Sequence, residues 1–168
     1  YNVCTDTSDM GAIYSGRDWT SRGNVVRYNY IHDMKMISEN NTGMKICGVY
    51  LDDCHSSTTV YGNVFYNIEQ IALIGGGRNN VFQNNLMINC SQPLRLDSRG
   101  LGWMAESTSM DNMYSNLEAV PYKEGIWAET YPELVNILDD EPGAPKYNNI
   151  SNNVQYQSEG YDIDQVAL

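Results

Sequence analysis

The sequence predicts an all-β protein built as a parallel β-helix, a solenoid with about 22 residues in each coil. One asparagine-containing motif recurs along the chain and sets this period. A short β-branched and aromatic run precedes the motif at a nearly constant offset. The leucine scaffold of leucine-rich repeats and the 3.6-residue pattern of helical repeats are both missing from the sequence. A β-solenoid is therefore the repeat architecture that fits.

The repeated motif aligns four asparagines in one column: Asn29, Asn63, Asn85 and Asn153. The middle pair is 22 positions apart, which is the basic period. The first interval, of 34 positions, indicates one coil with an insertion, and the last, of 68, is close to three periods. Stacked coils lie about 4.8 Å apart, so equivalent asparagines can bond to one another. We expect Asn29, Asn63 and Asn85 to form a buried ladder at a bend, because asparagine tolerates left-handed backbone.

Each coil should hold two or three short strands. One set covers residues 11–14, 48–51, 71–74 and 93–96, and the others lie in the asparagine motifs at 24–34, 59–68, 80–90 and 149–158. These runs are rich in β-branched and aromatic residues and are separated by Gly, Asn, Asp and Ser, which favour turns. Their regular spacing predicts strands that stack coil upon coil.

The whole chain, residues 1–168, is predicted to be one β-helix domain with two interruptions. Residues 35–45 are polar and read as a loop inserted into an early coil. Residues 101–147 break the period and predict an excursion packed on the solenoid, with a helix after Ser107 or Ser109 and a short helix at 131–138. The chain begins inside a motif, with no capping element before Tyr1, so we expect a fragment of a longer solenoid.

The amino-acid composition limits the kinds of molecule that we expect this chain to bind. A net charge of −11 and a pI of about 4.4 argue against a nucleic-acid partner, which needs a basic footprint. No apolar run approaches the roughly 18 residues of a membrane span, so we expect no membrane association. Four cysteines without CxxC spacing and only two histidines argue against a metal site of the zinc type.

The coil alignment predicts a catalytic column just past one set of strands. It places Ser15, Asp52, Gly75 and Asp97 in one column, and Gly16, Asp53, Gly76 and Ser98 in the next. Asp52 and Asp97 are then two coils apart, about 9–10 Å between backbones. Inverting glycosidases hold two carboxyls about 6.5–9.5 Å apart, and the glycines between them would leave a floor for a sugar ring. Aspartate and glycine are also ordinary turn residues, which is the simpler alternative.

Asp53 is a further catalytic candidate because it adjoins Asp52. Two adjacent carboxylates raise one another's pKa, so one of them could stay protonated and act as a general acid. The alternative is that the two side chains diverge and serve only the turn.

Several long side chains near this column are candidate substrate contacts. An arginine can neutralise a uronate or bond sugar hydroxyls, or it can pair with the nearby acids. The three tryptophans, Trp19, Trp103 and Trp127, lie in loops, where their rings could stack on sugars or anchor the loops. We expect substrate contacts from Arg78, Arg99, His55, Trp19 and Trp127.

The segments 9–34, 48–67, 74–80, 96–100, 121–134 and 145–154 together resemble the right-handed parallel β-helix proteins of the pectate-lyase-like superfamily. Within it they are similar to a bacterial group of glycoside hydrolases with α-fucosidase and xylanase activities on plant cell-wall glycans. The resemblance covers nearly the whole chain. It implies a right-handed coil, which the crossover rule for parallel strands also favours. It also implies that Asp9 borders the cleft, as a further catalytic candidate.

The expected function is that of an inverting glycoside hydrolase on a polysaccharide or oligosaccharide, with no cofactor. A polysaccharide lyase is the second enzyme reading. It would use a Lys or Arg base, with Ca²⁺ held by Asp52, Asp53 and Asp97. A non-catalytic glycan-binding or structural β-helix is the third reading. Because large glycans cannot enter the cytoplasm intact, we expect an extracellular or periplasmic bacterial protein.

Overall fold

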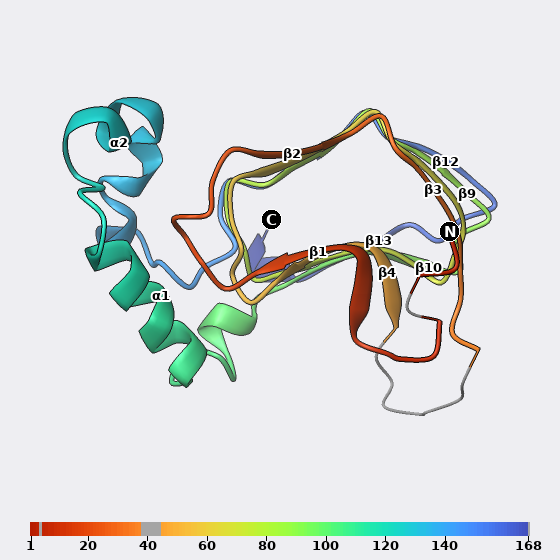
Figure 1. Cartoon of the computed structure of the whole chain (residues 1–168), viewed down its shortest axis with the longest axis horizontal. Helices are drawn as coiled ribbons and strands as arrows, with labels where there is room; N and C mark the ends of the chain where they lie inside the picture. The colour runs from red at the N-terminus through yellow and green to blue at the C-terminus, as the bar shows by residue number, and fades with distance from the viewer. Residues whose placement is uncertain (4, 38–44, 168) are drawn as a thin grey trace.

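The computed structural model describes residues 1–3, 5–37 and 45–167 and shows three parallel β-sheets arranged as a β-solenoid (Figure 1). Sheet A contains β1 (Met10–Gly16), β4 (Ile46–Asp52), β7 (Gln70–Gly75), β10 (Gln92–Asp97) and β13 (Tyr161–Ile163). Sheet B contains β2 (Asn24–Arg27), β5 (Thr58–Tyr61), β8 (Val81–Gln83) and β11 (Asn149–Ser151). Sheet C contains β3 (Tyr30–Met34), β6 (Val64–Ile68), β9 (Leu86–Ile88) and β12 (Val154–Tyr156). The chain visits the sheets in the order A, B, C in each coil.

The core fills the inside of the coils because alternate residues of each strand point inward. Sheet A contributes the column Leu51, Ile74 and Leu96, one residue per coil. Sheets B and C contribute Phe82 and Phe65, whose rings stack 5.7 Å apart between centroids. A buried parallel sheet needs an inward face that is apolar along its whole length. The aliphatic and aromatic residues at these inward positions provide that face.

The predicted asparagine ladder is present at the bend between sheets B and C. The Oδ1 atom of Asn63 accepts hydrogen bonds from the backbone N–H and the side-chain amide of Asn29, at 3.0 and 2.9 Å. Asn63 donates in the same two ways to Asn85, at 2.9 and 3.0 Å. Asn85 does the same to Asn153, at 2.9 and 3.0 Å. Each amide therefore ties two successive coils together.

Two details of the ladder differ from expectation. Asn63 and Asn85 are buried, but Asn29 is exposed because it lies on the first coil of the column. The left-handed residues of the bend are not the ladder asparagines but the residues before them: Tyr28, Gly62, Asn84 and Asn152. The ladder amide is thus aimed along the stack by the turn that precedes it.

A second asparagine column, which the sequence pattern left unassigned, lies at the bend between sheets A and B. The Oδ1 atom of Asn80 accepts from the backbone N–H of Thr58 at 3.0 Å. The backbone N–H of Asn80 donates to Oδ1 of Asn148 at 2.9 Å. The side-chain amides of both asparagines satisfy backbone carbonyls, of His55 and Gly77. Two of the three bends are therefore fixed by asparagine side chains.

The 68-residue interval between the last two ladder asparagines is one coil and not three. β9 and β12 are directly paired, so Asn85 and Asn153 lie on adjacent coils. The additional length is the excursion, which spans residues 98–148 between β10 and β11 and so begins slightly earlier than expected. The other insertion lies between β3, ending at Met34, and β4, beginning at Ile46, as expected; its residues 38–44 lie outside the described residues.

The excursion contains α1 (Thr108–Glu118), α2 (Gly125–Thr130) and the 3-10 turns η1 (Arg99–Leu101), η2 (Pro132–Leu134) and η3 (Ile137–Asp139). Ser107 caps α1 as expected by accepting from the N–H of Met110. The helix expected at 131–138 is instead the two turns η2 and η3, because the backbone leaves the helical region between them at Asn136, with φ −111° and ψ 16°. A last turn, η4 (Gln165–Ala167), follows β13. All the described helices are too short or too polar to cross a bilayer.

Figure 1 places α1 and α2 beside the corner where sheet A passes into sheet B. A second apolar cluster joins them to the solenoid and contains fully buried Trp19 together with Met104, Met113 and Leu117. Two ion pairs support this contact, Arg22 with Glu133 at 2.7 Å and Arg78 with Asp140. The excursion is thus packed on the solenoid at one corner.

Replacing Asn63 by alanine should lower the free energy of unfolding by about 1–3 kcal/mol, because it leaves the N–H of Asn29 and the carbonyl of Val26 without their partner. Asn29→Ala is the matched control at the exposed end of the ladder and should cost clearly less. Urea denaturation of both variants measures the difference. Equal losses would contradict the ladder as a source of stability.

Candidate functional site

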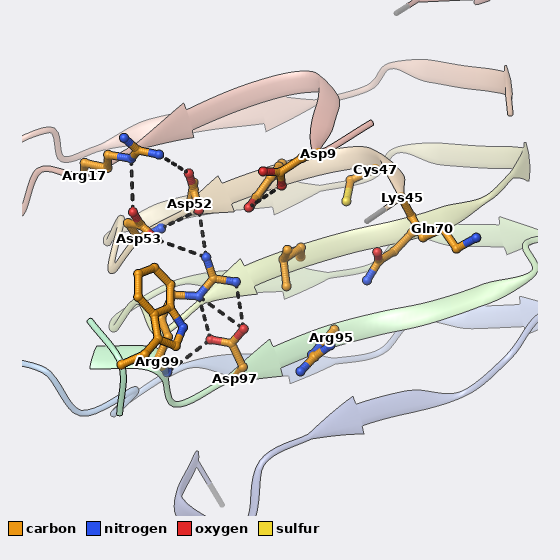
Figure 2. Close-up of a pocket in the computed structure, with 13 residues that line it drawn as sticks. Asp9, Arg17, Lys45, Cys47, Asp52, Asp53, Gln70, Arg95, Asp97 and Arg99 are labelled. Atoms are coloured by element: carbon orange, nitrogen blue, oxygen red, sulfur yellow. Dashed lines mark hydrogen bonds and ion pairs between the residues drawn. The ribbon is translucent and has the colours of Figure 1, made fainter. Parts of the chain in front are cut away.

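A cavity of about 380 Å³ lies on the outer face of sheet A and extends from the amino ends of its strands, at Lys45 and Gln70, to their carboxyl ends, at Asp52 and Asp97 (Figure 2). Its wall carries the four expected carboxylates, Asp9, Asp52, Asp53 and Asp97. It also carries four cationic side chains: Arg17, Lys45, Arg95 and Arg99. The charged residues predicted from the coil alignment are therefore brought together at one site.

The strand register confirms the column of Asp52, Gly75 and Asp97, since Gly75 pairs with Asp97 and Leu51 with Ile74. The first coil contributes Gly16 to this column and not Ser15, because Gly16 pairs with Asp52. Ser15 pairs with Leu51, one position earlier. The expected column was therefore shifted by one residue in the first coil only.

Arg99 occupies the space between the carboxylates, as Figure 2 shows. Its Nη1 atom donates to Oδ1 of Asp52 at 2.8 Å and to Oδ1 of Asp53 at 3.0 Å. Its Nε and Nη2 atoms donate to the two oxygens of Asp97 at 2.9 and 2.8 Å. One planar guanidinium thus holds three aspartates from two coils. The glycine floor expected to hold a sugar is filled by this side chain.

Gly75 forms the seat of the Arg99 guanidinium. A Cβ atom at position 75 would lie 2.6 Å from Cζ of Arg99, so no side chain larger than hydrogen fits beneath it. The next residue, Gly76, has a φ of +73°, which turns the chain directly after β7. The glycines of this coil therefore serve the arginine and the turn.

Asp52 is the most heavily hydrogen-bonded carboxylate of the site. Besides Arg99, it accepts from the Tyr14 hydroxyl at 2.7 Å, from Arg17 at 3.2 Å and from the N–H of Asp53 at 2.9 Å. Burial acts to raise the pKa of Asp52, but the tyrosine hydroxyls and the arginine charges outweigh it and leave the pKa lowered. Asp52 is therefore ionised and fully engaged in holding its neighbours.

The pKa of Asp53 is shifted in the opposite direction to that of Asp52. Burial and the negative charge of Asp52 raise its pKa above the ordinary value for aspartate, despite the hydrogen bond from Arg99. Its second oxygen forms an ion pair with Nε of Arg17 at 3.1 Å, and the Arg17 side chain is more than half exposed. The two adjacent carboxylates are thus separated in acidity, and Asp53 is the one that holds a proton more readily.

Asp9 and Trp103 complete the accessible part of the cavity. Asp9 is exposed and accepts from the hydroxyl of buried Tyr50 at 3.0 Å. Trp103 is 68% exposed, and its ring centroid lies 5.8 Å from Cζ of Arg99. Trp103 is absent from the contacts expected from the sequence. Its place in an irregular turn, outside any repeat, gave no alignment that could have positioned it.

Four expected substrate contacts lie away from the cavity and are not supported. Trp19 and His55 are fully buried, and Trp127 packs against the Trp19 cluster. Arg78 is buried and bonds to Asp140 and to the carbonyl of the same residue. Trp19 and Trp127 therefore fit the alternative of anchoring the excursion, and Arg78 fits the alternative of pairing with a nearby acid. The helices of the excursion also do not cover the cavity; among the described residues of 101–147, Trp103 is the one that lines it.

Within the described part of the chain, no group of three or more His, Cys, Asp or Glu side chains is arranged to hold a metal ion. The three aspartates considered for Ca²⁺ instead surround the Arg99 guanidinium. A cation would have to displace this arginine to reach them.

Comparison of the chain with protein-family models, with curated proteins and with solved structures finds no match. The geometry of the site is therefore the basis for its interpretation.

Arg99→Met should lower the free energy of unfolding by about 3–5 kcal/mol, because it leaves buried carboxylates without their partner. Gly75→Ala should cost less but act by the same route, since its Cβ displaces the guanidinium. The double variant should therefore lose less than the sum of the two. Gly102→Ala is the control, because its Cβ would meet no atom closer than 3.7 Å. If denaturant titrations show that the losses in free energy of unfolding add, the packing of the Arg99 guanidinium on Gly75 is contradicted.

His55 should make stability fall as the pH is lowered. Burial lowers its pKa from 6.5 to about 4, so the folded state keeps it neutral while the unfolded state takes up a proton. The contribution of neutral His55 to the free energy of unfolding is fully present above pH 6.5. About 3 kcal/mol of it should be lost as the pH falls from 6.5 to 4. Comparison with His55→Gln isolates this effect, because the other groups titrate in both proteins. A pH profile that is the same in both would contradict it.

Proposed function

We propose that this chain is a carbohydrate-active β-helix protein and that it hydrolyses glycosidic bonds with inversion. The observation that carries the proposal is the pair of acidities in the cavity, where Asp53 has a raised pKa and the adjacent Asp52, bonded to the same guanidinium, has a lowered pKa. Groups whose acidities are driven apart in one cavity are the usual sign of acid–base catalysis.

Asp53 takes the role of general acid and Asp97 that of general base. Asp53 gives its proton to the glycosidic oxygen as the bond from that oxygen to the anomeric carbon breaks. Asp97 accepts a proton from water as the water oxygen bonds to the same carbon from the opposite face. Oδ1 of Asp97 accepts from the backbone N–H and from Nε of Arg99, and Oδ2 accepts from Nε and Nη2, so a catalytic water takes the place of one of these bonds.

The separation of these two groups is compatible with inversion. Both carboxylates bond to the same guanidinium, at 3.0 Å from Nη1 and 2.8 Å from Nη2. Two such bonds across one guanidinium place the bonded oxygens at most about 8 Å apart, a limit that overlaps the range of about 6.5–9.5 Å for inverting enzymes. Asp52 is then a positioning residue, and the substrate lies above Arg99 on its solvent side.

A lyase receives less support from the same contacts. Burial acts to lower the pKa of Arg99, but its bonds to Asp97, Tyr50 and Asp53 outweigh this and leave the pKa raised. An arginine held this firmly in its charged form is a poor base. One observation favours the non-catalytic reading, namely that Asp52 and Asp97 are both held in ion pairs with Arg99. The site could on that basis bind a glycan without cleaving it.

We also propose a right-handed coil and an extracellular or periplasmic bacterial location. The handedness is supported by the preference of parallel strands for right-handed crossovers. The location is supported by the proposed substrate, since an intact polysaccharide is met outside the cytoplasm.

Asp53→Asn and Asp97→Asn should each lower kcat on fucosylated xyloglucan or xylan by at least about 10²-fold. Asp111→Asn, on the exposed face of α1, is the control and should leave kcat unchanged. Proton NMR of the first product should show inverted anomeric configuration. Retained configuration, an unsaturated product absorbing in the ultraviolet, or full activity in both variants would contradict the mechanism.

Activity should also fall as the pH rises through the raised pKa of Asp53, because the general acid must carry its proton. The alkaline limb of the kcat/KM profile reports this group in the free enzyme. A limb that persists in the residual activity of Asp53→Asn would assign it to another residue.

A further inference from the structure

The cations of the cavity already have carboxylate partners within the protein. Arg99 is shared by three aspartates, and Arg17 pairs with both Asp52 and Asp53. Lys45 pairs with Glu69 at 2.9 Å. Arg95 lies 3.8 Å from Asp162, the loosest of these pairs. A ligand that carried its own negative charge would have to displace a protein carboxylate at each of these positions.

The negative charge around the cavity also opposes the binding of an anionic ligand. Glu69 and Asp162 add two carboxylates next to the four that line the cavity, against four cations. The chain as a whole carries −11. A field of this sign slows the approach of an anionic chain, and every cation among the described residues of the cavity wall already has a carboxylate partner. Sugar hydroxyls, in contrast, can bond without displacing a charge, since exposed groups of the cavity such as Asp9 and Arg17 have further hydrogen-bonding capacity.

The accessible aromatic surface of the cavity comes from Trp103. Its ring is 68% exposed, and Arg99 lies against it. Arg99 is itself held by three aspartates, so the indole is backed by a fixed group. A flat apolar ring of this kind suits the C–H face of a pyranose, which is buried by stacking.

We propose that the cavity accepts a neutral pyranose of a glycan, stacked on Trp103, and discriminates against uronate and sulfated sugars. The proposal rests on the proposed function in taking the ligand to be a carbohydrate. It adds the charge class of the sugar and the residue that binds its apolar face.

The test is binding of the labelled chain to an array of plant cell-wall oligosaccharides that contains neutral members and uronate members of matched length. The bound members should be neutral. Titration of the strongest neutral member should give an affinity that is nearly unchanged between about 0.05 and 0.5 M salt, because no ion pair is formed. Trp103→Ala should weaken that affinity by at least about tenfold.

Tyr156→Ala is the matched control, an equally exposed aromatic on sheet C that lies outside the cavity. It should bind as the wild type does. Preferential binding of uronate members, a strong salt dependence, or wild-type affinity in Trp103→Ala would each overturn the proposal. Neutral binding without turnover would remove the hydrolase but keep this inference. Binding of no member of the array would remove both.

Discussion

The spacing of about 4.8 Å between stacked coils is the constraint on which the rest of this structure depends. Every feature that repeats must satisfy its hydrogen bonds along the stack, because parallel strands pair only with the coils above and below. The asparagine columns meet this condition at two bends, where Asn63 and Asn80 bond across coils and also satisfy backbone carbonyls. A residue held in the left-handed region before each ladder position aims the amide along the stack. Register is thereby fixed at the corners, and the strands between them follow.

The same spacing creates the charged site. The aspartates that end β4 and β10, two coils apart, are brought to one site, although neither would be stable there alone. Arg99 resolves the conflict by reaching back over Gly75 to the coils on both sides. The cost of gathering carboxylates is thus offset by one guanidinium. The tyrosine hydroxyls on Asp52, and burial with the charge of Asp52 acting on Asp53, leave the two carboxyls with different acidities.

The sequence was informative wherever the period applied. The strands of sheet A, the ladder at Asn63 and Asn85, and the column of Asp52, Gly75 and Asp97 all follow from alignment of one coil on the next. The one-residue error at Ser15 arose in the coil with the inserted loop, where the interval no longer matches the period. Trp19, His55 and Arg78 were misassigned because alignment gives the position of a backbone but not the side that a neighbouring excursion will cover. The reach of Arg99 between coils was likewise invisible, since it depends on a side-chain direction.

The excursion between β10 and β11 has a consequence for how the chain folds. The corresponding turns of the two preceding coils, residues 53–57 and 76–80, are short, whereas this one spans residues 98–148. Closing the longer loop costs about 2 kcal/mol more in chain entropy. The helices of the excursion can form locally, but β11 gains its pairing with β8 only after the whole detour is closed. The final coil should therefore pair with the preformed stack last. Packing of the Trp19 cluster should hold the excursion against the solenoid and so stabilise this last pairing.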